Sequence, residues 1–276
     1  MKEVMMRELN VEELKAIQLQ ILDEVMSFCE ENEIKCWLNG GTLLGAVRHK
    51  GYIPWDDDVD LGMLRPDYDK FMAAFNNHSK RYKFVSYETD HDSFEWFGKV
   101  FDTSTVLYEP DEKGERLSVY VDIFVMDNAP ESKAEQAKMF RKRNFFIVCN
   151  LARKLPILLK PTKGGFLRRI AVSAFRAVLR VFPKHYFTAQ LVKNAKSHSC
   201  DETGLVGDFS GLRIAVCKRE VLENLVELEF EGKKYKAPEG YDQWLTLLYG
   251  DYMKLPPAEK RVSTHFFKAY IKEQGD

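Results

Sequence analysis

The chain of 276 residues is 45% hydrophobic and 30% charged, so it can bury a proper core as one large domain or a compact pair. Its formal net charge of −1 gives no electrostatic reason to expect a nucleic-acid partner. Its five cysteines are scattered and form no CxxC pair, which excludes a disulfide framework and a zinc site and indicates reduced thiols in a cytosolic protein.

The N-terminal part of the chain predicts an amphipathic helix and no export signal. The first residues are charged and lack an apolar signal core, and no uninterrupted apolar run approaches the roughly 18 residues of a transmembrane helix. Asn10, with Glu13 three residues later, is a variant of the capping box and predicts a helix over residues 10–31. Its apolar side is made by Leu14, Ile17, Ile21, Val25 and Phe28.

Paired glycines come after a short predicted strand at residues 35–38. Gly40 and Gly41 end this strand, and residues 42–47 are typical of a first helical turn. Glycines between a strand and a helix expose backbone N–H groups that can bind an anion. The spacings of a P-loop and of a Rossmann fingerprint are absent. The glycines therefore indicate a phosphate site only in combination with the acidic residues that follow them.

An acidic run stands 15 residues after Gly41, at Asp56, Asp57, Asp58 and Asp60. Apolar, β-favouring residues surround it and predict a half-buried strand. Because strand side chains alternate, the three even-numbered acids would share one face and Asp57 would lie on the other. Three like charges on one face need a cation between them, and magnesium takes carboxylate oxygens together with substrate phosphates. The alternative is a solvated acidic turn.

The next predicted elements alternate between helix and strand. Arg65 and Pro66 open a helix, with proline in its first turn. Strands are predicted at residues 82–87, 96–102, 105–109 and 119–125, and the second and third of these are expected to form a pair.

A single acid interrupts the most apolar of these strands. Asp122 lies within residues 119–125, where an isolated buried carboxylate is costly unless it is paired or bound to a metal. This makes Asp122 the expected third metal ligand, beside Asp58 and Asp60. The alternative is that the strand lies at an edge and Asp122 is solvated.

Residues 136–200 have a different character, with 15 Lys or Arg residues and no Asp or Glu. Prolines and glycines break this segment into helices, and one of them carries arginines at positions 168, 169, 176 and 180. A basic amphipathic helix favours contact with a membrane surface. The alternatives are a helical insert that only balances the acidic site, and a nucleic-acid surface, for which no motif is present.

The C-terminal part returns to an α/β pattern. Strands are predicted at residues 205–209 and 214–217, a hairpin at 228–236, and a helix at 241–248. Arg261 and His265 then stand four residues apart, so they would share one helix face.

Several segments resemble the signature of the LicD family of phosphotransferases, which belongs to the nucleotidyltransferase superfamily. The similarity runs from about residue 37 to about residue 265, although residues 131–200 carry no matching motif. The matching residues are Gly41-Thr42-Leu43-Leu44-Gly45, Arg48, Ile53-Pro54-Trp55-Asp56-Asp57-Asp58-Val59-Asp60, Val121-Asp122-Ile123-Phe124, Tyr249-Gly250-Asp251-Tyr252-Met253 and Leu255-Pro256-Pro257.

The resemblance implies an α/β (α+β) fold, with a nucleotidyltransferase-like mixed sheet flanked by helices and a basic helical insertion. Residues 1–130 would form the catalytic core, residues 131–200 the insertion, and residues 201–276 the part that completes the catalytic domain.

The resemblance also implies roles for particular residues. Asp58, Asp60 and Asp122 would hold magnesium, or manganese in its place, with Asp56 as an additional carboxylate ligand, and Asp122 would take the proton from the attacking hydroxyl. The donor phosphates would be bound by Gly40, Gly41, Thr42, Arg48, His49, Lys99, Arg261 and His265. For Lys99 the alternative is a solvated strand lysine, and for His265 a structural histidine.

The implied activity is transfer of phosphocholine, or a similar alcohol phosphate, from CDP-choline or a related CDP-alcohol to a sugar hydroxyl, with release of CMP. The acceptor would be a cell-surface glycan, such as lipopolysaccharide or teichoic acid, or its lipid-linked precursor at the cytoplasmic face of the membrane. Aromatic side chains could surround the choline by cation–π attraction. The alternatives are a nucleotidyltransferase that releases pyrophosphate, and a non-enzymatic membrane-associated scaffold.

Overall fold

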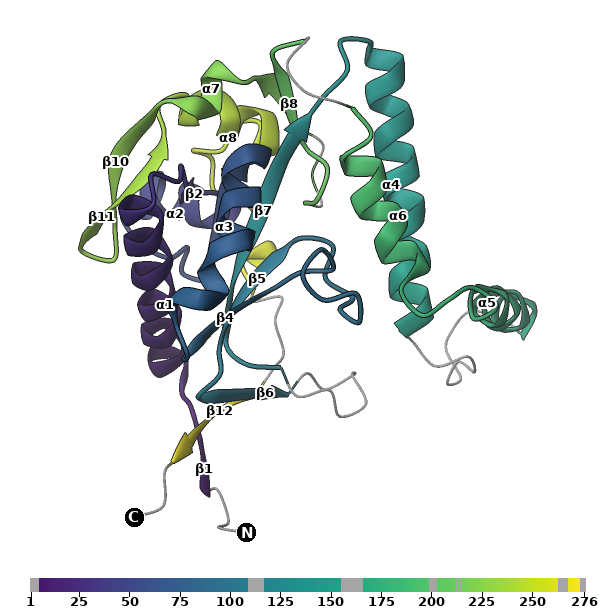
Figure 1. The fold of residues 1–276 in the computed structure, drawn as a ribbon, viewed down its shortest axis with the longest axis horizontal. Helices are drawn as coiled ribbons and strands as arrows, with labels where there is room; N and C mark the ends of the chain where they lie inside the picture. Colours follow the sequence, from purple (N-terminus) through teal and green to yellow (C-terminus); the bar gives the residue numbers. More distant parts are fainter. Residues whose placement is uncertain are drawn as a thin grey trace.

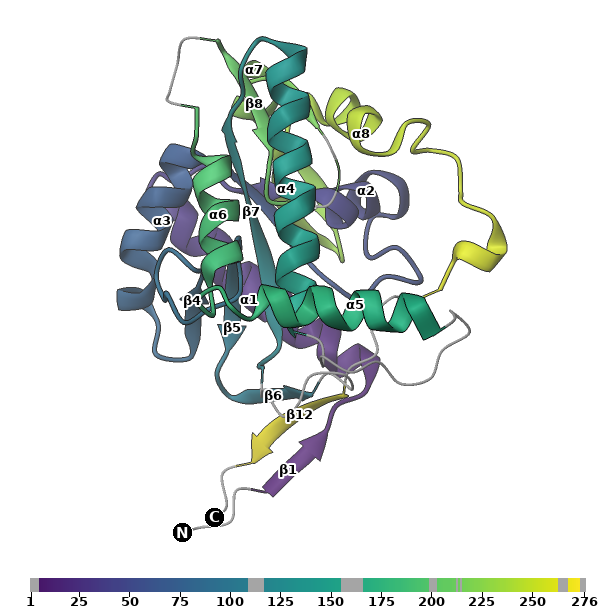
Figure 2. The same cartoon turned by 90° about the vertical axis from the view of Figure 1, so that its right-hand side faces the viewer.

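The computed structural model describes residues 5–108, 117–154, 166–198, 203–211, 213, 215–262 and 268–273. They form a mixed α/β fold in which helices cover both faces of a curled sheet (Figures 1 and 2). The predicted fold class is therefore confirmed. Four of the cysteines, Cys29, Cys36, Cys149 and Cys217, are buried free thiols, as expected.

The main sheet is organised around β7, whose residues 120–126 pair with β3 and β5 and whose residues 126–128 pair with β8. The β3–β7 pair is parallel, and the other described pairs of this sheet are antiparallel. Its strands are β2 (Trp37–Leu38), β3 (Asp60–Leu64), β4 (Tyr82–Val85), β5 (Gly98–Asp102), β7 (Tyr120–Asn128), β8 (Leu205–Asp208) and β9 (Val216–Lys218).

One face of this sheet is covered by α1 (Val11–Glu31) and α3 (Arg65–His78) (Figure 1). The predicted capping box forms, because the Asn10 side chain accepts from the Glu13 N–H and the Glu13 carboxylate accepts from the Asn10 N–H. The apolar side of each helix is buried in the main core. The amphipathic periodicity of the sequence therefore predicted these helices correctly.

The opposite face is covered by α4 (Lys133–Lys154) and α6 (Tyr186–Ala195), with α5 (Phe166–Leu179) crossing α4 near its end (Figures 1 and 2). Separate small apolar clusters hold these helices together, one of them formed by Cys149, Leu179 and Phe187. Within the described ranges, no helix is both long and apolar enough to cross a membrane.

The C-terminal part packs beside α2 (Gly40–His49) and supplies two helices, a two-stranded sheet and one strand of a three-stranded sheet. The predicted hairpin is confirmed, and Glu231 and Gly232 make its turn with positive φ angles of 50° and 75°. The elements of this part and their partners are α7 (Glu220–Glu223), β10 (Leu225–Phe230), β11 (Lys233–Pro238), α8 (Tyr241–Tyr249), the 3₁₀ turn Ala258–Lys260, and a sheet of β1 (Met5–Glu8), β12 (Lys268–Glu273) and β6 (Thr105–Tyr108).

Two strand predictions were wrong. The acidic run was expected to lie within a strand, but β3 begins only at Asp60, and residues 56–59 form a loop. The strands at 96–102 and 105–109 were expected to pair, but β5 pairs with β4 and β7, while β6 pairs with β12. Strand pairing depends on distant segments, so local periodicity could not identify these partners.

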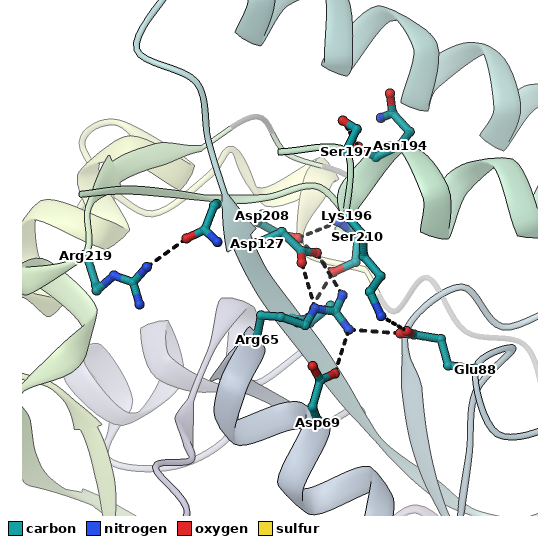
Figure 3. A network of polar contacts seen from close by, with 12 residues as sticks. Arg65, Asp69, Glu88, Asp127, Asn194, Lys196, Ser197, Asp208, Ser210 and Arg219 are labelled. Atoms are coloured by element: carbon teal, nitrogen blue, oxygen red, sulfur yellow. Dashed lines mark hydrogen bonds and ion pairs between the residues drawn. The ribbon is translucent and has the colours of Figure 1, made fainter. Parts of the chain in front are cut away.

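An ion-pair network with Arg65 and Asp127 buried at its centre joins the two faces of the sheet (Figure 3). Arg65, at the start of α3, donates two hydrogen bonds of 2.7 and 2.9 Å to the Asp127 carboxylate on β7. It also donates to Glu88 at 3.0 Å, and Glu88 accepts from Lys196, just beyond α6, at 2.6 Å. The ion pair of Lys196 with Glu88 therefore links the α4–α6 side of the sheet to α3 on the other face.

Candidate active site

Asp60 is held where the first turn of α2 meets the start of β3. The Gly41 N–H donates to Oδ2 of Asp60 at 3.3 Å, and the Asp60 N–H donates to Oγ1 of Thr42 at 2.8 Å. The backbone of Asn39 adds a third bond, from its N–H to the Asp60 carbonyl at 2.9 Å. These contacts fix the Asp60 carboxylate at the N-terminal end of α2, where the helix dipole favours negative charge.

The paired glycines make room for two of the acids. Gly40 has φ +51°, and a Cβ atom there would lie 2.5 Å from Oδ2 of Asp60. A Cβ atom on Gly41 would lie 2.7 Å from Oδ2 of Asp56. Glycine at both positions therefore leaves space for the chain's own carboxylates. Binding of a donor phosphate by the N–H groups of Gly40 and Gly41 stays a prediction.

Replacing Gly40 with alanine is expected to cost stability and activity together. Alanine at a positive φ costs about 1–2 kcal/mol of folding free energy, and its methyl group would displace Asp60, where a shift of about 1 Å can lower kcat about 10²-fold. Gly232→Ala is the matched control, because Gly232 also has a positive φ but open space around its Cβ position. Both variants should lose similar stability in denaturant titrations, and only Gly40→Ala should lose activity.

A cavity of about 450 Å³, hereafter the acidic cavity, brings Asp58, Asp60 and Asp122 to one place. Asp60 and Asp122 are direct neighbours in the parallel β3–β7 pair. Asp122 is 9% exposed, and its strand has neighbours on both sides, so the edge-strand alternative is wrong. The rest of the lining comes from Asn39, Gly40, Trp96, Phe97, Phe124, Ile147, Leu151, Asp208, Ser210, Gly211, Arg213, Leu248 and Tyr249.

The carboxylates of this cavity repel one another. Burial raises the pKa of Asp60 well above its usual range, and the neighbouring charges of Asp58, Asp122 and Asp56 raise it further. The N–H of Gly41 opposes this shift only in part. Such a cluster is a good oxygen donor set for a hard divalent cation, whose charge would stabilise the ionised form of Asp60.

The acidic side chains do not converge closely on one point. Among the residues that the structure places, no three acidic, histidine or cysteine side chains form a ready metal-binding group. Asp56 does not line the acidic cavity, although its Oδ2 lies close to Gly41. A shared metal ion at Asp58, Asp60 and Asp122 therefore stays a prediction based on the chemistry of the donors.

Lys99 is buried beside Asp122 and is not the solvated lysine of the alternative interpretation. The two residues are direct partners across β5 and β7, and Nζ of Lys99 lies 2.5 Å from Oδ1 of Asp122. Burial opposes the charge of Lys99, but the carboxylate of Asp122 outweighs it and raises the lysine pKa. Nζ also lies 3.7 Å from the centre of the Tyr120 ring. Lys99 therefore balances the charge of Asp122.

Three other predicted phosphate-binding residues lie apart from the acidic cavity. Arg48 is eight residues beyond Gly40 on α2, which is about 12 Å along a helix axis, and it donates to the Tyr252 carbonyl at 2.7 Å and to His49. Arg261 lies over the Trp55 ring at 5.8 Å. The side chains of Arg48, His49 and Arg261 do not line the acidic cavity. His265 lies outside the described residues.

The structure adds a cation that the sequence interpretation missed. Arg213 lines the acidic cavity, donates to the Leu248 carbonyl at 3.0 Å and lies over the Tyr249 ring at 4.4 Å. Shortly before Arg213 in the chain, Oδ1 of Asp208 accepts hydrogen bonds from the backbone N–H groups of Ser210 and Gly211 and shapes the turn at these residues. Tyr249 belongs to a motif that the sequence analysis identified. No local pattern marks Arg213, because its position depends on its contacts with α8.

This chain is similar to known proteins of one family. A family model described as "LicD/FKTN/FKRP, nucleotidyltransferase domain" matches residues 33–151. The "Lipopolysaccharide cholinephosphotransferase LicD" of Haemophilus influenzae is 31% identical over 278 aligned residues, which cover 96% of this chain and 100% of that protein. The human "Ribitol 5-phosphate transferase FKRP" is 51% identical over 43 residues, which are 16% of this chain and 9% of that protein. Because one similarity spans both proteins almost completely, the chain belongs to the LicD family and is a transferase.

Proposed function

We propose that this chain transfers phosphocholine, or a similar alcohol phosphate, from a CDP-activated donor to a sugar hydroxyl and releases CMP. The acceptor is a cell-surface glycan such as lipopolysaccharide, or its lipid-linked precursor, at the cytoplasmic face of the membrane. The observation that carries the proposal is the near full-length similarity to a protein named as a lipopolysaccharide cholinephosphotransferase. The carboxylates of Asp58, Asp60 and Asp122 in the acidic cavity support it.

The two kinds of named relative favour an alcohol phosphate as the transferred group. The cholinephosphotransferase matches along the whole chain, whereas the ribitol 5-phosphate transferase matches only 43 residues. Both names describe transfer of an alcohol carrying a phosphate. We infer that the short common segment serves the phosphate chemistry shared by these proteins, while the identity of the alcohol is determined elsewhere in the chain.

Asp58, Asp60 and Asp122 would hold magnesium, or manganese in its place, with Asp56 nearby. When bound, the ion would neutralise charge on the transferred phosphate and on the leaving nucleotide. Asp122 would accept the proton of the attacking sugar hydroxyl, and Lys99, bonded to its Oδ1, would fix its orientation. Arg213 supplies positive charge at the same cavity and would contact a donor phosphate.

Aromatic side chains of the acidic cavity suit the choline group. Trp96, Phe97 and Phe124 line it, and the rings of Phe97 and Phe124 stack with centroids 4.8 Å apart. A quaternary ammonium is attracted to the faces of such rings. The cavity therefore combines carboxylates for the phosphate and its cation with aromatic rings for the alcohol.

A product assay separates this proposal from nucleotidyl transfer. Purified protein is incubated with magnesium, a panel of CDP-alcohols and a glycan acceptor, and the products are identified by mass spectrometry. We expect CMP together with an alcohol-phosphate-modified glycan. Release of pyrophosphate from a nucleoside triphosphate would support the alternative nucleotidyltransferase, and no phosphodiester with any donor would contradict the proposal.

Removal of divalent cations is expected to reduce the activity to background. EDTA treatment followed by magnesium or manganese should restore it, because the transferred and leaving groups both develop negative charge. An independent measurement is the melting temperature, which should rise with added magnesium because the ion binds the folded chain. Asp57→Asn should retain this rise, since Asp57 does not line the acidic cavity, and Asp60→Asn should abolish it. An equal rise in both variants would contradict the assigned ligands.

A further inference from the structure

α5 lies on the outside of the molecule, where it crosses α4 near the end of that helix (Figures 1 and 2). Leu179, at the end of α5, packs with Cys149 and Phe187 in a small cluster. The side chain of Arg153 on α4 donates to the Leu179 carbonyl. This attachment fixes one side of α5 and leaves the other side to solvent.

The exposed side of α5 is apolar. Ile170 is 49% exposed and Val178 is 58% exposed, whereas Arg176 is 8% exposed. At 100° per residue, the exposed apolar residues cover an arc of about 160° around the helix. This arc consists of Ile170, Ala171, Ala174, Phe175, Ala177 and Val178. The sequence analysis counted Arg176 among the arginines of a basic amphipathic helix, but α5 turns this arginine inward and its apolar side outward.

A second exposed apolar row lies on α4. Phe145, Val148 and Leu151 are spaced three residues apart, so they share one face of the helix, and all three are exposed. Leu151 also lines the acidic cavity. The apolar surface of this part of the molecule therefore reaches the edge of the candidate active site.

The segment that carries both apolar rows has charges of a single sign, although acidic residues of other segments, among them Asp92 and Glu95, lie beside Leu151. Residues 136–200 contain 15 Lys or Arg and no Asp or Glu. Arg168 is exposed beside the apolar arc of α5, and Arg180 is exposed one residue beyond the helix. A second copy of the chain would bring like charges together on this face. An anionic lipid surface instead complements both features, with acyl chains for the apolar arc and phosphate groups for the arginines.

We propose that α5 lies flat on an anionic lipid bilayer, with its apolar arc in the interfacial region and with Arg168 and Arg180 on lipid phosphates. The docked helix orients α4 so that Leu151 and the edge of the acidic cavity face the lipid surface. An acceptor carried by a lipid would meet the active site there. The docking itself does not depend on the identity of the transferred group.

The test measures binding of the full chain to vesicles that contain neither donor nor acceptor. Vesicles of phosphatidylcholine and phosphatidylglycerol in a two-to-one ratio are compared with vesicles of phosphatidylcholine alone, by co-sedimentation. We expect binding only to the anionic vesicles, and weaker binding at high salt. Val178→Asp should weaken it by roughly tenfold or more. Arg168→Gln combined with Arg180→Gln should weaken it and reduce its salt dependence.

Val11→Asp is the matched control, because Val11 is also a helical valine with 58% of its surface exposed. It should bind vesicles as the wild type does, and circular dichroism should show that every variant is folded. Equal binding of Val178→Asp and the wild type, or absence of binding to anionic vesicles, would overturn the proposal. A change of molar mass in Val178→Asp without lipid, with vesicle binding unchanged, would instead assign the apolar arc to a second copy. A product assay without vesicles tests the proposed activity separately.

Discussion

Asp60→Asn is expected to lower kcat by about 10³-fold and, in metal-free protein, to raise the melting temperature. The two effects have one cause. Burial and the charges of Asp58, Asp122 and Asp56 disfavour the ionised form of Asp60, as its raised pKa indicates. An asparagine of the same shape keeps an acceptor for the Gly41 N–H and removes the repulsion. The site therefore holds charge at the expense of stability, as functional sites often do.

The loss of activity results from the place of the removed charge. Asp60 lies next to Asp122 in register and lines the cavity with Asp58. If these carboxylates hold the cation of the reaction, the neutral amide weakens that binding and the neutralisation of the transferred phosphate. Steady-state kinetics with saturating donor and acceptor measure the change in kcat, and calorimetry measures the melting temperature.

Asp57→Asn is the control for this prediction. Asp57 belongs to the same acidic loop but lines a different pocket, beside Trp55 and Asp56. It should retain kcat within a few-fold of the wild type. Equal losses in Asp57→Asn and Asp60→Asn would show that the net charge of the loop matters and not the convergence of particular carboxylates. Undiminished activity in Asp60→Asn would remove Asp60 from the catalytic set.

Arg65→Met is expected to lower the free energy of unfolding by about 3–5 kcal/mol. Asp127 is 2% exposed, and its two carboxylate oxygens both accept from Arg65. Burial opposes the charge of Arg65, but the hydrogen bond and charge of Asp127, with the charge of Glu88, outweigh it and raise the arginine pKa. Methionine would leave the Asp127 carboxylate buried without this partner. Urea titration followed by circular dichroism measures the loss.

Two further variants test the physical reason. Arg65→Met combined with Asp127→Leu should recover much of the stability, because an apolar pair can replace a buried ion pair. Lys236→Ala, which removes the exposed pair with Glu227, should leave the unfolding midpoint unchanged within error. If Arg65→Met alone behaved like Lys236→Ala, the network of Figure 3 would not be a main connection between the two faces of the sheet.

The sequence by itself determined the elements whose signals are local. The capping box at Asn10 and Glu13 and the hairpin at residues 228–236 depend on hydrogen bonds and backbone preferences within a few residues. The apolar periodicity of α1 and the apolar run of β7 also showed which residues are buried. A carboxylate within that run was enough to single out Asp122.

Only the tertiary structure decided which distant groups meet. The apolar residues around the acidic run favoured a strand, but residues 56–59 form a loop because Asp60 is held by α2, and β3 begins there. Lys99 faces Asp122 through strand pairing, and Arg213 reaches the acidic cavity beside α8. Likewise, the contacts of α5 with α4 turned Arg176 inward. Pairing and burial are properties of contacts between remote segments, and no periodicity within one segment encodes them.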